Sequence, residues 1–186
     1  MRIIGGESRG RTIRLPAGCR IRPTADRVKE ALFNILGSVE GKSLLDLYAG
    51  SGNIGLEALS RGARRSLFLE KDPRLVEAIR NNLRLFGFDS RAEVIAADAA
   101  EGLGLLGKRG ERFDFLFADP PYEKGFLATI VSPLEKAELL TEKGIVILQH
   151  SLREPLERSV TGALSVIDQR RYGDTLLSFL MKHREE

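Results

Sequence analysis

The residues with the clearest potential for chemistry are Asp119, Pro120, Pro121 and Tyr122, which follow the apolar run Phe115–Ala118. The prolines lack backbone donors and have a fixed φ, so this segment offers mainly acceptors. Asp119 and the Pro120 carbonyl could hold both hydrogens of an exocyclic amine on a nucleic-acid base, while Tyr122 stacks on that base. We therefore predict a catalytic site for direct in-line methyl transfer to such an amine, accelerated by positioning and electrostatics and without a metal ion. The alternative is a proline-stiffened strand exit without chemistry.

A second candidate element is the glycine turn Gly50-x-Gly52-x-x-Gly55, between an expected strand at Ser43–Leu47 and an expected helix at Asn53–Ser60. By itself this spacing is typical of a dinucleotide-binding dehydrogenase. However, Asp46 precedes the first glycine by four residues, where a carboxylate would repel a pyrophosphate. It suits instead the cationic methionine portion of S-adenosylmethionine. The chain also lacks a second nucleotide-binding half, so S-adenosylmethionine is the favoured cofactor.

Two further acids follow the next expected strands and extend this predicted cofactor pocket. Glu70 could accept hydrogen bonds from the ribose hydroxyls, and Asp98 could accept one from the adenine amino group. Either acid alone would more often be a solvated loop residue, but the carboxyl ends of parallel strands share one edge of a sheet. The predicted cofactor-binding residues are Asp46, Tyr48, Ala49, Gly50, Ser51, Gly52, Gly55, Glu70, Lys71, Asp98 and Ala99.

The elements that position these residues alternate along the chain. Strands are expected at 43–47, 66–70, 92–96, 113–118 and 145–148, and helices at 53–60, 73–86, 99–106 and about 125–140. This alternation predicts a doubly wound α/β sheet of mostly parallel strands. The segment 165–182 has no helical stripe and predicts a closing antiparallel hairpin through Tyr172-Gly173-Asp174.

Before this core, the sequence predicts a short hairpin over residues 2–15 and a helix that ends at Gly37. Thr24 is its expected N-cap, and Val28, Ala31, Leu32, Ile35 and Leu36 form its expected apolar stripe, with Arg27, Lys29 and Glu30 off it. The organisation expected is a single domain, 1–186, with a basic N-terminal hairpin and helix in 1–37 and a catalytic core in 38–186.

The N-terminal region is strongly basic. Residues 1–29 contain seven arginines and Lys29 against Glu7 and Asp26, a balance of +6 in a chain of net charge +3. A polyanionic partner and a merely solvated basic surface explain this charge about equally well. The candidate RNA-binding residues are Arg2, Arg9, Arg11, Arg14, Arg20, Arg22, Thr24 and Arg27.

Composition narrows the classes of protein further. The chain has 186 residues, 42% of them hydrophobic and 30% charged, as expected of one globular domain. Cys19 is the only cysteine, which excludes an internal disulfide and fits a reducing compartment. Because it lies in the basic segment, a cysteine nucleophile for methylation of a ring carbon is not expected. No signal peptide or membrane span is expected, so a cytoplasmic location without membrane contact is predicted.

In sequence order, the chain resembles the RsmD family of methyltransferases over essentially its whole length. The matching segments are Arg2–Gly6 with Arg9-Gly10-Arg11, Arg22–Glu30, Asp46–Ala58, Glu70-x-Asp72, Asp119–Tyr122 and Tyr172–Thr175. The resemblance implies a class I methyltransferase fold of Rossmann-like type, S-adenosylmethionine as donor, and methylation of guanine N2 in small-subunit (16S) ribosomal RNA. It assigns the cofactor to Asp46, Gly50, Gly52, Glu70 and Asp98, the guanine amine to Asp119–Tyr122, and RNA contact to Arg22–Arg27.

One departure and two alternatives accompany this resemblance. Many relatives have an acidic residue near the end of the fifth strand, where this chain has Gln149-His150, and we interpret His150 as structural rather than as a general base. DNA adenine N6-methylation would use the same acceptors, but so short a chain has no separate target-recognition domain. A nucleic-acid-binding protein without catalysis is disfavoured by the intact Asp46, Glu70 and Asp119. The expected substrate is ribosomal RNA within a small subunit or its assembly intermediate, bound by a monomer.

Overall fold

The computed structural model describes residues 1–19, 26–120, 133–134, 138–154, 156 and 163–183. The chain is built from two compact units, Met1–Asp98 and Ala99–Glu186. In the described residues, no helix is long and apolar enough to cross a membrane.

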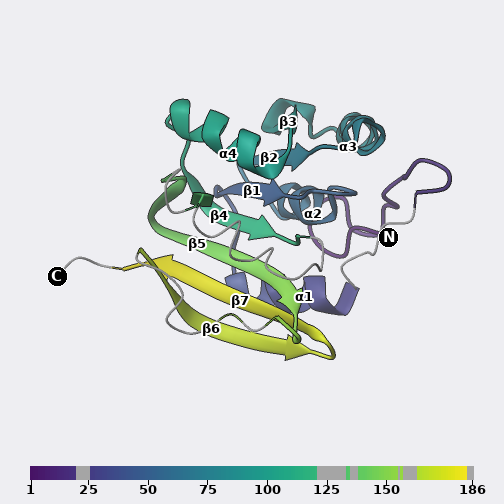
Figure 1. Cartoon of the computed structure of the whole chain (residues 1–186). Coiled ribbons are helices and arrows are strands. Elements are labelled where there is room, and N and C mark those ends of the chain that lie inside the picture. The colour runs from purple at the N-terminus through teal and green to yellow at the C-terminus, as the bar shows by residue number, and fades with distance from the viewer. Residues whose placement is uncertain (20–25, 121–132, 135–137, 155, 157–162, 184–186) are drawn as a thin grey trace. The chain divides into compact units, whose positions relative to one another are not determined.

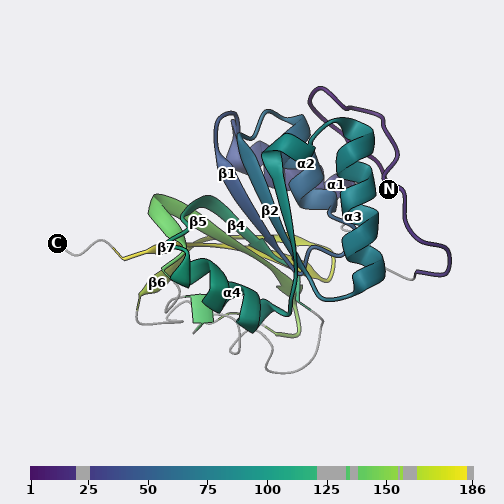
Figure 2. The same ribbon diagram turned by 90° about the horizontal axis from the view of Figure 1, so that it is seen from above.

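The first unit contains a parallel three-stranded arrangement in the order β3-β2-β1 (Figure 1). Its strands are β1 (Ser43–Leu47), β2 (Arg65–Glu70) and β3 (Ala92–Ala96). Its helices are α1 (Asp26–Leu36), α2 (Asn53–Ser60) and α3 (Pro73–Phe86), with a 3-10 turn, η1, at Asp89–Arg91. Helix α2 packs on β1 and β2, and α3 packs on β2 and β3 (Figure 2).

Local sequence explains these boundaries. Asp72 accepts a hydrogen bond from the Arg74 amide at the start of α3, Pro73 is the first helical residue, and Gly87 ends the helix with φ 75°. Helix α2 is buried along its whole length, unlike the half-exposed α3. It approaches β2 so closely that a Cβ on Gly55 would lie 2.2 Å from the Phe68 ring. A side chain at position 55 would therefore push α2 away from the sheet.

The N-terminal hairpin is confirmed in a shorter form than expected. A single antiparallel bridge joins Arg2 and Thr12, and the Ile3 amide donates to the Arg11 carbonyl at 2.9 Å. Ile3 and Ile13 are buried in the same hydrophobic cluster as residues of α2, β2 and α3. We call residues 1–14 the arm, and its docking on the first unit depends on these two isoleucines.

Gly6 lies where the arm makes its tight contact with the backbone of Ser60. It has φ +76°, and a Cβ there would lie 1.8 Å from the Ser60 carbonyl oxygen. Gly10 has a similar φ of +86°, but no atom lies within 4 Å of its Cβ position. We expect Gly10→Ala to lower the free energy of unfolding by about 1–2 kcal/mol through backbone strain alone. Gly6→Ala should cost clearly more in urea denaturation, and equal losses in the two variants would contradict this tight contact.

Helix α1 differs from its sequence prediction in the face that it buries. Its buried residues are Val28, Lys29, Leu32 and Phe33, whereas Ile35 is 39% exposed. The prediction that Lys29 lies off the buried face is wrong, since its side chain is fully buried. The helix is rotated relative to its apolar stripe because Lys29 has an ionic partner in α2, described below. The expected N-cap, Thr24, is outside the described residues.

The second unit contains α4 (Ala99–Lys108) and four strands in the order β4-β5-β7-β6 (Figure 1). They are β4 (Phe113–Ala118), β5 (Leu140–Ser151), β6 (Leu164–Tyr172) and β7 (Thr175–Lys182). Strands β4 and β5 are parallel, whereas β7 is antiparallel to both β5 and β6. The predicted C-terminal hairpin is confirmed, and Gly173 supplies its turn with φ 63°.

Strand β5 is longer than the predicted 145–148 at both ends, because Leu140 pairs with Phe113 of β4 and residues 149–151 pair with β7. Phe113 pairs with Leu140, while Phe115 pairs with Ile145, so the extra β5 residues form an irregularity that no periodic pattern reveals. The helix predicted at about 125–140 falls largely outside the described residues, and its last residue, Leu140, begins β5. The mostly parallel α/β class with an antiparallel end is confirmed.

Candidate active site

The glycine turn between β1 and α2 has an unusual backbone. Tyr48, Gly50 and Gly52 all have positive φ, at 62°, 54° and 73°. The two glycines adopt this region readily, but a tyrosine there is strained by about 1–3 kcal/mol. The Gly52 amide closes the turn by donating to the Ala49 carbonyl at 2.7 Å. The strained residue, Tyr48, is therefore in the turn that we predict to bind the cofactor.

Glu70 fixes this turn from the end of the neighbouring strand. Its Oε2 accepts from the Gly50 amide at 2.7 Å, and its Oε1 accepts from the Asp72 amide at 2.8 Å. Asp46 is 2% exposed, and its Oδ2 accepts from the Gly55 amide at 3.0 Å in the first turn of α2. Both predicted acids therefore lie at the carboxyl ends of β1 and β2, bonded to backbone amides. Their contact with a cofactor stays a prediction.

Asp98 is exposed beyond the end of β3. Burial raises the pKa of the Tyr48 hydroxyl to about 12, and the negative charge of Asp98 contributes to that rise. Tyr48 and Asp98 are thus electrostatic neighbours at the same edge as Glu70. Of the remaining predicted pocket residues, Ala49 and Ser51 are buried in the turn and Lys71 is exposed. Ala99, half-buried, begins the second unit.

In the second unit, Asp119 directly follows β4 and is half-buried. Its Oδ2 accepts a hydrogen bond from Gln149 Nε2 at 2.8 Å. Pro120 is buried, and Pro121 and Tyr122 lie outside the described residues. Sequence reasoning left Gln149 without a role. The parallel pairing of β4 with β5 could have found it, because Ala118 pairs with Leu148 and the next residue of each strand is Asp119 and Gln149.

His150 lies in a polar network within the second unit and is 1% exposed. Its Nδ1 lies 2.8 Å from the Glu154 carbonyl, so Nδ1 carries the proton of the neutral ring. Its Nε2 then accepts from the Ser178 hydroxyl at 2.7 Å. This arrangement supports the structural interpretation of His150.

Burial lowers the pKa of His150 below its usual 6.5. A depressed folded-state pKa gives a contribution to stability that is complete above pH 6.5 and is lost as pH falls toward the folded value. We expect stability to fall between pH 6.5 and 5 by up to about 1.4 kcal/mol per pH unit from this group. In urea denaturation at pH 7.5 and pH 5, His150→Gln should lose less stability between the two conditions than the wild type. His183→Gln, at an exposed position, is the control, and identical pH dependence in all three proteins would refute the assignment.

Two of the N-terminal arginines predicted to contact RNA, Arg2 and Arg11, also bind other parts of the first unit. The Arg11 guanidinium stacks over the Phe86 ring at 4.4 Å and donates to the Leu85 carbonyl, so it holds the arm on α3. Arg2 pairs with Asp26 at 3.4 Å. Arg9, Arg14 and Arg27 are exposed, as the prediction of RNA contact requires. The other predicted RNA contacts, Arg20, Arg22 and Thr24, lie outside the described residues.

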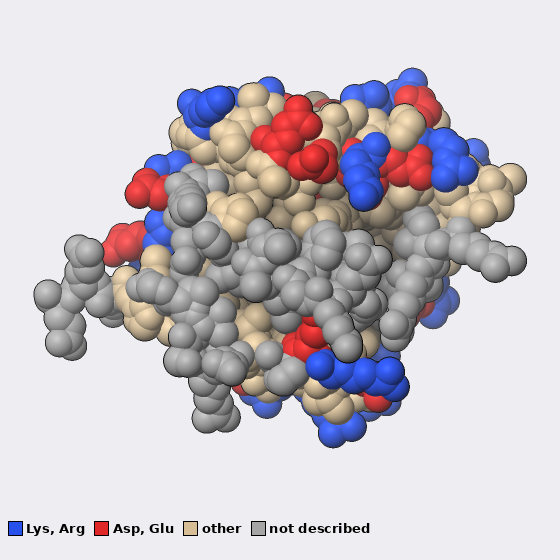
Figure 3. Space-filling view, in the orientation of Figure 1, with Lys and Arg blue, Asp and Glu red and all other residues tan. Residues whose placement is uncertain are grey.

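The charged surface is mixed rather than uniformly basic. Figure 3 shows basic and acidic side chains interspersed over the part of the surface that carries β3 and α3. Ion pairs such as Arg84–Glu77 and Arg74–Asp72 on α3 account for part of this pattern. Most of the excess positive charge belongs to residues 1–29, whose balance is +6 while the rest of the chain sums to −3.

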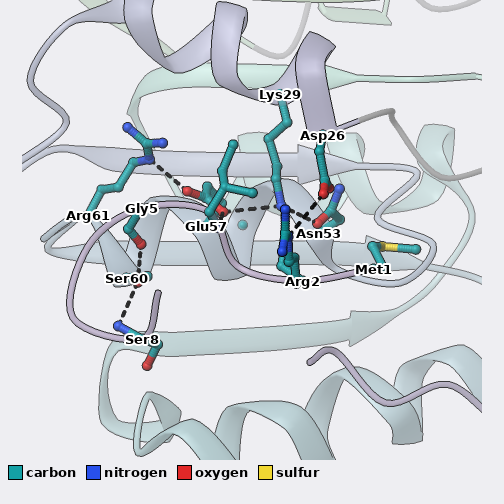
Figure 4. A network of polar contacts seen from close by, with 12 residues as sticks. Met1, Arg2, Gly5, Ser8, Asp26, Lys29, Asn53, Glu57, Ser60 and Arg61 are labelled. Carbon is teal, nitrogen blue, oxygen red and sulfur yellow. Dashed lines mark hydrogen bonds and ion pairs between the residues drawn. The ribbon is translucent and has the colours of Figure 1, made fainter. Parts of the chain in front are cut away.

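A buried ionic network joins the arm, α1 and α2 (Figure 4). Lys29 Nζ lies 3.1 Å from Glu57 Oε2 and donates to the Arg2 carbonyl at 2.6 Å and to Asn53 Oδ1 at 2.7 Å. Glu57 also accepts from the Ile4 amide at 2.9 Å and from Arg61 Nε at 2.7 Å. Asn53 directly follows Gly52, so the network ends at the glycine turn. Lys29 and Glu57 both lie in segments that resemble the family, but no pattern in the sequence predicts that they pair.

Comparison with known proteins places this geometry in a family. Residues 1–181 match the family described as Conserved hypothetical protein 95. The chain belongs to this family. A relative in Bacillus subtilis, the putative rRNA methyltransferase YlbH, is 34% identical over 98% of this chain and 99% of its own length. Ribosomal RNA small subunit methyltransferase D of Escherichia coli is 34% identical over 84% of this chain and 77% of its own, which confirms the RsmD resemblance.

Solved structures confirm the fold over the whole chain. The putative methyltransferase yhhF from Escherichia coli has a TM-score of 0.87 and 31% identity, covering 100% of this chain and 99% of that one. A hypothetical protein of Thermus thermophilus, TTHA0928, has a TM-score of 0.80 and 34% identity over 96% and 98% of the two chains. The family is therefore one of methyltransferases, and the class I methyltransferase fold is confirmed.

Proposed function

We propose that this chain transfers a methyl group from S-adenosylmethionine to the exocyclic N2 amine of a guanine in small-subunit (16S) ribosomal RNA. The observation that carries the proposal is Asp119, half-buried at the end of β4, with its Oδ2 fixed by Gln149 and followed by the buried Pro120. The 34% identity to ribosomal RNA small subunit methyltransferase D supports the choice of substrate.

The first unit contains groups that fit the cofactor. The turn at Tyr48, Gly50 and Gly52 brings backbone to the sheet edge, and Glu70 and Asp98 add carboxylates for ribose hydroxyls and an adenine amine. Both Glu70 oxygens already accept one amide each, but a carboxylate oxygen has lone pairs for a second donor. When bound, S-adenosylmethionine supplies an electrophilic methyl group on a sulfonium.

Asp119 performs the step on the base side. The lone pair of a base amine is delocalised into the ring, so the amine is a poor nucleophile until it is oriented. Asp119 accepts a hydrogen bond from the amine and directs its lone pair along the line of transfer. The nitrogen–carbon bond forms as the sulfur–carbon bond breaks, and the amine proton leaves to the Asp119 carboxylate or to solvent. The carboxylate also stabilises the positive charge that develops on the nitrogen.

The partner and setting complete the proposal. The basic N-terminal residues bind ribosomal RNA in a small subunit or an assembly intermediate, and the protein acts as a cytoplasmic monomer.

Incubation with labelled S-adenosylmethionine and unmethylated small-subunit particles should give labelled N2-methylguanosine in digested RNA, identified by mass spectrometry. Label in N6-methyladenosine of duplex DNA supplied in a parallel incubation, or no labelled nucleoside in the particles, would overturn the proposal.

Charge reversal in the N-terminal region should weaken RNA binding without changing chemistry. Arg9 and Arg27 are exposed, and each RNA phosphate that the protein no longer neutralises should reduce the slope of log affinity against log salt by about 1. Filter binding of Arg9→Glu and Arg27→Glu from about 50 to 300 mM salt measures this slope. Arg84→Glu, on α3 outside the N-terminal region, is the matched control. A slope unchanged in both N-terminal variants would remove these residues from the RNA interface.

A further inference from the structure

Gln149 lies where it can act on the base as well as on Asp119. Strands β4 and β5 are parallel with Ala118 opposite Leu148, so Asp119, the residue after β4, comes next to Gln149 of β5. Gln149 is 5% exposed, and its Nε2 donates to Asp119 Oδ2 at 2.8 Å. Asp119 as a whole is half-buried, so this pair lies near the surface of the second unit at the end of β4.

The chemistry of the two groups fixes the orientation of the amide. An ionised carboxylate only accepts hydrogen bonds, so the amide nitrogen of Gln149 must face Asp119 and the amide oxygen must face away from it. In the part of the chain that the structure describes, this buried Oε1 has no hydrogen-bond partner. Buried polar atoms are nearly always paired, and an unpaired acceptor is costly. Oε1 therefore needs a donor that the described residues do not supply.

A guanine brings such a donor beside its target amine. Its Watson–Crick edge presents the N2 amine next to the ring N1–H, two donors in a row. Adenine presents its amine next to an unprotonated ring nitrogen, which is an acceptor. An acceptor pair made of Asp119 and Gln149 Oε1 matches the guanine edge and opposes the lone pair of adenine N1.

We propose that Gln149 is a specificity-determining residue that selects guanine: its Oε1 accepts the N1–H while its Nε2 holds Asp119 on the N2 amine. This inference rests on the proposed function. Since Oε1 is shielded from water, its hydrogen bond forms without solvent competition, and a base without N1–H leaves it unmade. Sites of this kind reject the analogue that lacks the donor far more strongly than apolar pockets do.

The test compares two bases that share the target amine, guanine with N1–H and O6 and 2-aminopurine with neither, so the change in preference on mutation of Gln149 is the quantity that decides. Once the methylated position is mapped, RNA is ligated with either guanine or 2-aminopurine there, since 2-aminopurine keeps the 2-amine but has an unprotonated N1. The wild type should prefer guanine in kcat/KM, and Gln149→Leu should reduce that preference by about 10–100-fold. Gln169→Leu is the matched control, because its amide bonds to Ser178 in the same unit, and should keep the wild-type preference. If Gln149 had a purely structural role, Gln149→Leu would lower kcat/KM equally for the guanine and the 2-aminopurine substrates. That result would overturn the inference.

Gln149→Glu gives an independent measurement in a side chain of the same shape. It keeps an acceptor for N1–H, so the preference for guanine should persist. It also places two carboxylates together, which then share a proton. Turnover should fall with rising pH as that proton leaves, an ionisation that the wild type lacks, and a wild-type pH profile would contradict the contact with Asp119. Failure of the wild type to methylate guanine would instead refute the proposed function.

Discussion

Replacing Asp119 with alanine is expected to lower kcat by about 100- to 1000-fold while leaving the affinity for S-adenosylmethionine nearly unchanged. The loss is large because the variant lacks the carboxylate that we propose to orient the amine. Asp119 lies at the end of β4, and a hydrogen bond from the Gln149 amide holds its Oδ2. The affinity is spared because the predicted cofactor contacts lie almost entirely in the first unit, at the glycine turn, Glu70 and Asp98. Single-turnover methyl transfer and calorimetric titration of the cofactor measure the two quantities separately.

Asp168→Ala is the matched control for this experiment. Asp168 is an acid of the same unit that pairs with Arg170 on β6 at 2.9 Å. Its removal should leave turnover and cofactor affinity as they are in the wild type. Normal turnover by Asp119→Ala would show that the amine is held elsewhere, whereas loss of cofactor affinity would show that Asp119 serves the cofactor and not the base.

Lys29→Met is expected to have the largest effect on stability, a loss of about 3–5 kcal/mol in the free energy of unfolding. Lys29 and Glu57 are both 0% exposed, and removing the ammonium leaves the buried Glu57 carboxylate with Arg61 as its remaining ionic partner (Figure 4). Burial lowers the pKa of Lys29, and the carboxylate of Glu57 opposes that shift. Urea denaturation at pH 7.5 measures the loss.

Two further variants separate the ion pair from simple loss of packing. Lys29→Met combined with Glu57→Met removes both buried charges and should recover a large part of the loss, since Arg61, the other partner of Glu57, is 24% exposed and can turn to water. Lys42→Met, at an exposed position, should change stability by less than about 0.5 kcal/mol. If the double variant were as unstable as Lys29→Met or more so, the loss would not come from a buried charge left without Lys29.

The sequence predicted the elements best where a residue and its neighbours decide the structure. Strand β1, helix α2 and strand β4 begin and end as predicted, because apolar runs and glycine turns are local signals. Helix α1 is different. The burial of Lys29 depends on Glu57, 28 residues later, and on a backbone carbonyl of the arm, which no helical periodicity contains.

In the candidate site, too, local signals could be predicted from the sequence and contacts between distant residues could not. Asp119, Glu70 and Asp46 could be placed at or near strand ends from the order of elements, because each lies where an apolar run predicted as a strand ends. The direction of the Asp46 side chain could not, since it depends on the closeness of the Gly55 amide. Gln149 was quoted as a departure from the family but was given no role, because its hydrogen bond to Asp119 depends on how β4 and β5 pair.

The docking of the arm also affects the order of events during synthesis. The Ile4 amide bonds to Glu57, the Ser8 amide to Ser60 and the Arg11 guanidinium to Leu85, across 53, 52 and 74 positions. Closing loops of this length costs chain entropy that only a formed α2 and α3 can repay. The arm is therefore synthesised before α2 and α3 but docks only after they have formed, so its four arginines are undocked beside ribosomal RNA while the rest of the unit is still being made.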